Sequence, residues 1–203
     1  QARIDVIAFS DMHAHWQEGI RHALAAVHNT NPDSTLVIDN GDLLTGSLLG
    51  AYLASGEAAW ETSEEPHPLL AALERAGGAV WVPGNHDIDY GAAFLRRAVR
   101  GLTSLQPVCA NLTDPTGELL FLPSVVVGRA GTRLGVVGAV TGHAQRLTRY
   151  EAARELICSP PLEAVRAEVA RLTGSVDAIV VAYHGGFAVD PRKGVPMPYP
   201  TGE

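Results

Sequence analysis

Short runs of apolar residues alternate along the chain with segments whose apolar residues recur at helical spacing. The runs predict strands, and a period of three to four residues predicts helices. Predicted strands span 3–9, 34–39, 79–82, 107–110 and 176–183. Predicted helices span 16–27, 67–76, 92–100 and 162–172. Strands that alternate with helices indicate an α/β fold with a mostly parallel sheet that helices cover.

Two further segments depart from this alternation. The β-branched runs 124–127 and 133–137 are joined by a short polar stretch, which predicts a hairpin and hence an antiparallel part of a sheet. From Asp190 to Glu203 the chain is rich in proline, which predicts a loop or linker. No apolar run approaches the roughly 18 residues that a membrane-spanning helix needs.

Polar residues that could bind a ligand or take part in catalysis follow four of the predicted strands. The segments are Asp11-Met12-His13, Gly41-Asp42, Asn85-His86-Asp87 and His184. In α/β folds, ligands bind beyond the carboxyl ends of the strands. The first two segments alone are typical of ordinary turns, the third is too long a motif to be only a turn, and His184 alone could equally cap the strand end or bind a ligand. The repetition after four strands indicates one shared site.

The residue types at these positions suit divalent metal ions. The carboxylate of Asp11 and the imidazole of His13 together favour a borderline ion such as Zn, Mn or Fe. Asp42 has two oxygens that could bridge two ions, while Asn85 offers an amide oxygen and His184 a second imidazole. Two ions ~3.5–4 Å apart that clamp a phosphoryl group are a recurring hydrolytic arrangement.

The acidic residues after Asn85 have a second interpretation. Asp87 and Asp89 could simply cap the helix that follows, and for Asp87 that interpretation is a good one. The histidines outside these segments are expected to lie on the surface or in packing positions; they are His15, His22, His28, His67 and His143.

The net charge of the chain limits which partners it could bind. A formal net charge of −7 argues against a nonspecific nucleic-acid binder, so no DNA partner is expected. A phosphate-bearing substrate is still possible, because bound metal ions can reverse the local field.

Cys109 and Cys158 match no metal or redox spacing, so buried thiols are expected, with a single disulfide as the alternative.

In this order, the polar segments resemble the signature of the calcineurin-like metallophosphoesterases. That signature runs Asp-x-His, Gly-Asp, Gly-Asn-His-Asp/Glu, a single His, and then Gly-His-x-His. Further stretches resemble the bacterial nucleotidase branch, which hydrolyses 5′-nucleotides or 2′,3′-cyclic and 3′-nucleotides; they are 39–42 with Gly46-Ser47, 84–91 with Phe94-Leu95, 110–112 and 180–185. The resemblance implies a metallophosphoesterase β-sandwich of mixed sheets flanked by helices, in four α/β/β/α layers.

The resemblance also implies roles for individual residues. Asp11, His13 and Asp42 would hold one divalent ion, and Asp42, Asn85 and His184 the other, with Mn, Fe, Zn, Co and Ni all acceptable. Asn85 and His86 would contact the substrate, and a metal-bound hydroxide would attack phosphorus in line. His86 and Asp89 would be catalytic: His86 stabilises the transition state or protonates the leaving alkoxide, and Asp89 orients its imidazole.

The substrate preference within the branch stays open. The run from Gly46 to Tyr52, together with His67-Pro68, resembles the cyclic-phosphodiesterase/3′-nucleotidase subgroup. Asp89 lies where 5′-nucleotidases tend to have Asp and the cyclic subgroup often has Asn.

The last block of the signature, Gly-His-x-His, does not occur after His184. We therefore expect residues 1–190 to be a partial catalytic domain, residues 191–203 to be a tail or linker, and a C-terminal remainder of the same protein to supply that block. The alternative is a catalytically incomplete fragment or remnant that binds metal, phosphate or a partner without turnover. The branch is mostly exported, so the resemblance implies a periplasmic, secreted or cell-surface protein.

Overall fold

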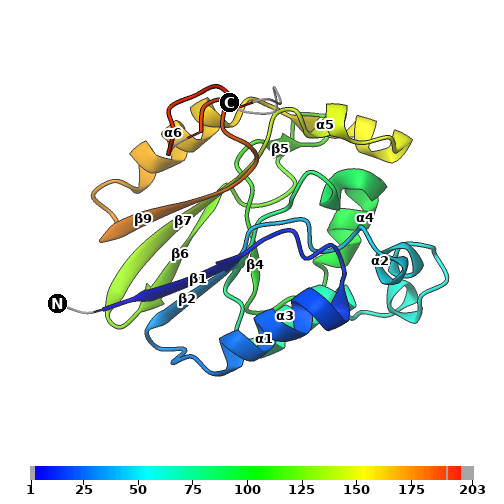
Figure 1. Cartoon of the computed structure of the whole chain (residues 1–203), viewed down its shortest axis with the longest axis horizontal. Helices are drawn as coiled ribbons and strands as arrows, with labels where there is room; N and C mark the ends of the chain where they lie inside the picture. The colour runs from blue at the N-terminus through cyan, green and yellow to red at the C-terminus, as the bar shows by residue number, and fades with distance from the viewer. Residues whose placement is uncertain (1–2, 191, 198–203) are drawn as a thin grey trace.

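Two stacked β-sheets form the centre of the computed structural model, which describes residues 3–190 and 192–197 (Figure 1). The first sheet is parallel and has the strand order β1-β2-β3-β4. Its strands are β1 (Asp5–Phe9), β2 (Thr35–Asp39), β3 (Val80–Trp81) and β4 (Gln106–Pro107). All four carboxyl ends therefore meet at one edge of the sheet.

The second sheet is mixed and has the order β6-β7-β9. Strands β6 (Ser124–Arg129) and β7 (Thr132–Val140) form the expected antiparallel hairpin, and β9 (Ala178–His184) runs parallel to β7. A separate antiparallel pair joins β5 (Leu112–Thr113) to β8 (Ile157–Cys158). The pair was not predicted, because two-residue strands carry no periodic signal.

An apolar core fills the space between the two sheets. Every second residue of the strands points into it, as the two-residue period of a strand requires. Its members include Leu36 and Ile38 of β2, Val80 of β3, and Leu134 and Val136 of β7, all of them buried. Burial of these β-branched and leucine side chains is the main force that holds the two sheets together.

Helices cover the outer face of each sheet, so the expected four α/β/β/α layers are confirmed. Helices α1 (Arg21–His28) and α3 (Pro68–Ala76) lie along the outer side of the first sheet, and α6 (Pro161–Leu172) lies over β7 and β9 (Figure 1). The predicted helix 16–27 is interrupted: a π-helical turn, Trp16–Ile20, precedes α1.

The remaining helices lie beside the carboxyl edge of the first sheet (Figure 1). They are α2 (Leu48–Leu53), α4 (Gly91–Ala98), α5 (Ala144–Leu147) and the 3₁₀ turns Ala59–Thr62, Asp87–Tyr90 and Glu151–Glu155. Of these, α4 was predicted, two residues longer at its end. The others are too short to show helical periodicity in the sequence.

Helix α3 shows how local sequence sets an element's ends. The Nδ1 atom of His67 accepts the N–H of Leu69 at 3.3 Å, and Pro68 occupies the first helical position. Burial lowers the pKa of His67 to about 3, so its imidazole stays neutral and can accept. Gly77 ends the helix with a φ of 104°, which glycine tolerates at little cost. The expectation that His67 is a packing residue is confirmed.

Further predictions concern the two cysteines, membrane-spanning helices and the C-terminal segment. Cys109 and Cys158 are buried thiols that no disulfide joins, and burial raises the pKa of Cys109 to about 12. Among the described residues, no helix combines the length and the apolar character that crossing a bilayer requires. The predicted tail lies outside the described residues at 191 and 198–203, and residues 192–197 carry no helix or strand. The domain boundary at 190 stays a prediction.

Candidate metal centre

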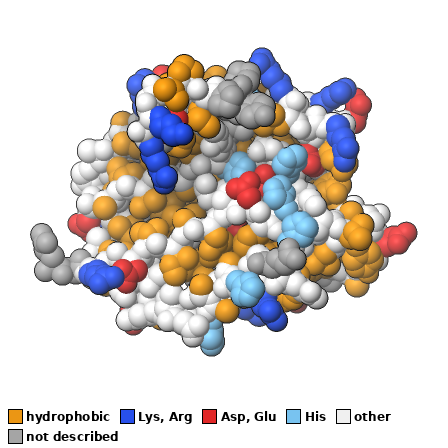
Figure 2. All heavy atoms as spheres, in the orientation of Figure 1, with side chains coloured by type: hydrophobic (Ala, Val, Ile, Leu, Met, Phe, Trp, Pro, Cys, Tyr) orange, Lys and Arg blue, Asp and Glu red, His pale blue; other side chains and the backbone are white. Residues whose placement is uncertain are grey.

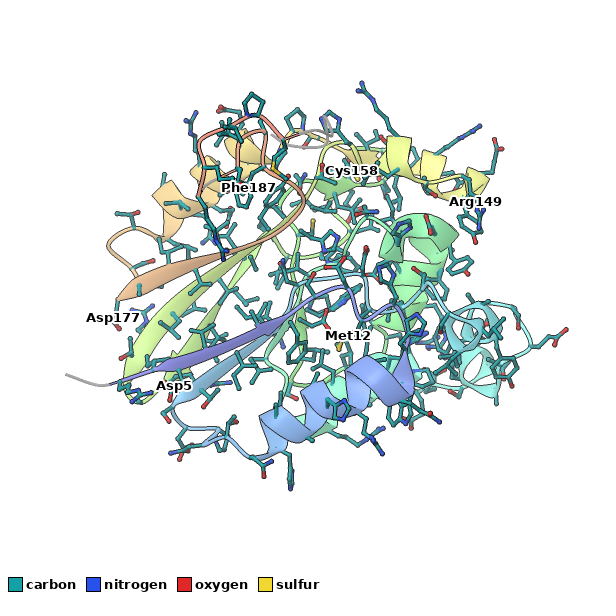
Figure 3. All side chains as sticks on the ribbon, in the orientation of Figure 1. Asp5, Met12, Arg149, Cys158, Asp177 and Phe187 are labelled. Carbon is teal, nitrogen blue, oxygen red and sulfur yellow. The ribbon has the colours of Figure 1, made fainter. Side chains whose placement is uncertain are left out.

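The loops after β1, β2, β3 and β9 come together beyond the carboxyl edge of the sheets. Backbone hydrogen bonds join the first two loops: Asp11 N–H donates to Gly41 O at 2.9 Å, and His13 N–H donates to Asp42 O at 2.7 Å. Figure 2 shows acidic and histidine side chains gathered on this face, and Figure 3 shows the loop that carries Met12 beside them. The predicted site residues are therefore brought to one place.

Three of the candidate ligands have strained backbones. Asp11, His13 and Asp42 have φ angles of 59°, 46° and 55°. This left-handed region is uncommon for residues with a side chain and costs energy. The surrounding hydrogen bonds keep these three residues in the left-handed conformation, which turns their side chains toward one another.

The carboxylate of Asp87 fastens the second loop to the third. It accepts the N–H groups of Asp42 at 2.8 Å, Leu44 at 2.7 Å and Gly84 at 2.8 Å. Burial, followed by the nearby charge of Asp42, raises the pKa of Asp87 to about 7. The expectation that Asp87 caps the following helix is wrong, because its carboxylate is turned back to these loops.

Distances between the candidate ligand atoms fit metal coordination. One oxygen of Asp42, Oδ2, lies 3.7 Å from His13 Nε2 and 3.4 Å from His184 Nε2. His184 Nε2 lies 3.2 Å from Asn85 Oδ1, and His13 Nε2 lies 3.9 Å from Asp11 Oδ1. Ligand atoms of Asp11, His13 and Asp42 all lie within 4.8 Å of one another. Donors that share one ion at about 2.1 Å are separated by roughly 3–4 Å, so the four individual distances above fit.

Asp42 is oriented by the residue that follows Asn85. Its Oδ1 atom accepts the backbone N–H of His86 at 2.8 Å, which leaves Oδ2 between the two imidazoles. Burial would raise the pKa of Asp42, but hydrogen bonding to His184 and the charge of that imidazole lower it overall. A carboxylate that stays ionised between two imidazoles has the form of a bridging ligand.

The orientation of the His184 ring is fixed by a contact at its Nδ1 atom. Its Nδ1 atom lies 2.6 Å from the carbonyl oxygen of Asn40, which leaves Nε2 directed at Asp42. Asn40 in turn donates from Nδ2 to Tyr183 O at 3.0 Å. Burial opposes a charge on His184, yet the hydrogen bond and the charge of Asp42 raise its pKa to about 9. The orienting role of Asn40 was missed, and its position before Gly41-Asp42 was the only signal.

Two glycines allow the loops to approach this closely. A Cβ atom on Gly84 would lie 2.1 Å from Asp42 Oδ1, and one on Gly41 would lie 2.8 Å from His184 Nδ1. Gly41 also has a φ of 94°. Any side chain at either position would displace a candidate ligand.

His86 and Asp89 form a pair beside the cluster. His86 Nδ1 lies 3.2 Å from Asp89 Oδ2, and this hydrogen bond, followed by further charge effects, raises the pKa of His86. The His86 ring is partly exposed and lines a cavity of about 540 Å³ together with His13, Tyr90 and Thr148. Asp89 faces His86 and the hydroxyl of Thr148, so the helix-capping interpretation of Asp89 is also wrong.

A second cavity also reaches the candidate ligands. It has a volume of about 270 Å³ and is lined by residues that include Asp11, Asn85, Thr141 and His184. Two cavities therefore reach the cluster of carboxylates and imidazoles.

An α/β sandwich that gathers Asp, His and Asn side chains at the ends of its strands is an arrangement that suits a metal-dependent hydrolase. The family model named calcineurin-like phosphoesterase matches residues 4–155. The chain belongs to this family.

Individual relatives agree with this placement. A 2′,3′-cyclic-nucleotide 2′-phosphodiesterase/3′-nucleotidase of Salmonella typhimurium is 29% identical over 169 residues, which are 78% of this chain and 26% of that protein. A protein of the same name from Yersinia enterocolitica is 37% identical over 95 residues, 46% of this chain and 14% of that protein. The chain thus spans about a quarter or less of the length of these curated relatives.

Solved structures show the same fold. The calcineurin-like phosphoesterase YfkN from Bacillus subtilis matches with a TM-score of 0.73 and 21% identity, covering 92% of this chain and 63% of that one. A putative 5′-nucleotidase from Staphylococcus aureus matches with a TM-score of 0.71 and 25% identity, covering 95% of this chain and 39% of that one.

Proposed function

We propose that this protein hydrolyses phosphoesters of nucleotides at a centre of two divalent metal ions. The observation that carries the proposal is the position of Asp42 Oδ2 between His13 Nε2 and His184 Nε2, at 3.7 and 3.4 Å. Asp11 and His13 would complete one metal position, and Asn85 and His184 the other. Bound there, the two ions would make water nucleophilic near neutral pH and would withdraw charge from the phosphoryl oxygens.

The chain's own residues would position the substrate and move one proton. Asn85 and His86 are adjacent, and each lines a cavity that reaches the ligand cluster. Since Nδ1 of His86 is turned to Asp89, Nε2 is the atom left to donate a hydrogen bond to a phosphoryl oxygen or a proton to the leaving oxygen. The hydrogen bond to Asp89 raises the pKa of this imidazole, which favours the protonated form that an acid needs.

Substrate choice follows from the names of the relatives. Both curated relatives described above are named for 2′,3′-cyclic-nucleotide and 3′-nucleotide hydrolysis. We therefore expect turnover of 2′,3′-cyclic AMP and 3′-AMP with added Mn²⁺, measured as released phosphate or as nucleoside by chromatography. Turnover of 5′-AMP alone would move the assignment to the 5′-nucleotidase side, and no turnover of any phosphoester by the full-length protein would contradict the proposal.

Replacing His86 separates catalysis from metal binding. His86→Ala removes the acid but none of the proposed metal ligands, so kcat should fall about a hundredfold or more while metal content is kept. Metal content is measured by mass spectrometry after gel filtration. The exposed His28 lies on α1 outside the site, so His28→Ala is the control that should keep full activity. Loss of metal in His86→Ala would contradict the role given to His86.

Metal binding should release a proton from His184. Its pKa, raised to about 9, means that the metal-free imidazole is protonated at neutral pH and must lose the Nε2 proton before it can coordinate. Affinity should therefore fall as pH drops below about 9, because a raised pKa favours the protonated, metal-free state.

Calorimetric titration of Mn²⁺ in buffers of different ionisation enthalpy counts the protons released. His184→Gln, which has no titrating ring, should release about one proton fewer than the wild type. Equal proton release by the two proteins would show that His184 is not the proton source.

Two features of the proposal reach beyond this chain. A C-terminal remainder that supplies Gly-His-x-His is proposed to complete both metal positions, and the short span relative to the longer relatives supports it. The full-length protein should then bind metal more tightly than residues 1–203 alone.

Action outside the cytoplasm is proposed from resemblance to the nucleotidase branch, and cell fractionation tests it.

A further inference from the structure

Asp89 carries two hydrogen bonds, one on each carboxylate oxygen. Oδ2 faces His86 Nδ1 at 3.2 Å, and Oδ1 accepts from the hydroxyl of Thr148, which lies far along the chain in the segment between α5 and the Glu151–Glu155 turn. The Asp89 side chain is almost fully buried, with 6% of its surface exposed. Water therefore cannot readily replace either partner.

The direction of the Thr148 hydroxyl is fixed by a third group. The backbone N–H of Tyr150 donates to Thr148 Oγ1 at 3.1 Å. A carboxylate oxygen accepts hydrogen bonds and does not donate them, so the proton of the Thr148 hydroxyl is directed at Asp89 Oδ1. The result is a one-way series of hydrogen bonds from Tyr150 N–H through the Thr148 hydroxyl to the carboxylate that faces His86.

We propose that Thr148 is a positioning residue for His86, acting through Asp89; the inference rests on the proposed function. A carboxylate can rotate about its Cβ–Cγ bond, and a bond on Oδ1 stops that rotation so that Oδ2 stays aimed at His86 Nδ1. The imidazole then keeps Nε2 directed at the cavity that Thr148 also lines. Thr148 thereby links one wall of the substrate cavity to the group that transfers the proton.

A purely structural role for Thr148 makes different predictions. If the hydroxyl only stabilised its own segment by accepting from Tyr150, its removal would loosen the segment without changing the His86–Asp89 pair. Thr148→Val removes the hydroxyl at nearly constant shape, and Thr148→Ser restores it without the methyl group. The exposed Thr116 makes the same kind of bond to a carboxylate, Asp114, at 2.6 Å, so Thr116→Val is the matched control.

Nuclear magnetic resonance of the metal-free protein, labelled with ¹⁵N at histidine, detects the hydrogen bond between His86 and Asp89 directly. The wild type should show a His86 Nδ1 proton that exchanges slowly with water, assigned by its loss in His86→Gln. Thr148→Val should broaden or remove this signal, while Thr148→Ser and Thr116→Val should keep it. An unchanged signal in Thr148→Val would overturn the inference, whether or not the protein hydrolyses nucleotides.

Kinetics of the metal-loaded protein supply a second readout. In Thr148→Val, kcat should fall about tenfold with little change in KM, because the proton-transfer group rather than substrate binding is disturbed. Thr148→Ser should recover most of the loss. A loss that serine does not rescue, or one that Thr116→Val shares, would also overturn the inference. Absence of turnover in the wild type would count against the proposed function alone, since the resonance readout does not depend on it.

Discussion

Replacing Asp42 with alanine is expected to abolish metal binding at both positions at once. Its Oδ2 atom is the only ligand atom that lies between both imidazoles among the described residues. Loss of the shared anionic ligand should lower turnover by about a thousandfold or more, since the ions supply several kcal/mol of transition-state stabilisation. Metal content by mass spectrometry and phosphate release measure the two effects together.

Two companion variants sharpen this prediction. Asp42→Asn keeps the shape and one carbonyl oxygen but removes the charge, so it should retain weak binding. Asp33→Ala removes an exposed carboxylate in the turn before β2, outside the cluster, and should keep both metal and activity. Retention of one tightly bound ion per chain in Asp42→Ala would contradict the bridging role, because it would mean that one position does not need Asp42.

The second large effect concerns stability. Asp87→Ala leaves three buried N–H groups, those of Asp42, Leu44 and Gly84, without their acceptor. Each such loss costs about 1–3 kcal/mol, and relief of the buried charge of Asp87 offsets part of the sum. The free energy of unfolding should therefore fall by about 3 kcal/mol. Urea unfolding of the metal-free protein measures it.

Glu74 provides a matched control for Asp87. Its Oε1 atom also accepts three backbone N–H groups, from Thr103, Ser104 and Leu105, but at the exposed surface. Partial burial opposes its ionisation, but these hydrogen bonds together lower the pKa of Glu74 overall. Water can replace the carboxylate there, so Glu74→Ala should cost only about 1 kcal/mol. Equal losses for the two variants would show that burial of the Asp87 contacts is not what makes them important.

The sequence was sufficient to predict the main architecture and every candidate ligand. Alternation of apolar runs and helical periods predicted most strands and helices, since those patterns depend only on neighbours along the chain. That alternation predicted one mostly parallel sheet, and only the family resemblance predicted the two-sheet sandwich. Asp11, Asp42, Asn85 and His184 were identified by their positions after strands, and the structure brings them together. Their roles as ligands stay predictions until a metal is measured.

What the sequence did not reveal depends on contacts between distant segments. Asp87 looked like a helix cap, because the pattern cannot show that its carboxylate meets N–H groups some forty residues earlier. Asn40 and Thr148 act through contacts more than fifty residues away, with His184 and Asp89. No local period encodes such contacts, and only the folded chain makes them visible.

Anomalous diffraction from crystals grown with Mn²⁺ tests the central claim most directly. The account predicts two peaks about 3.5–4 Å apart, one on each side of Asp42 Oδ2. One peak would lie nearest Asp11 and His13, and the other nearest Asn85 and His184. Peaks absent from this cluster in the full-length protein, or a single peak that Asp42 does not touch, would contradict the two-metal account.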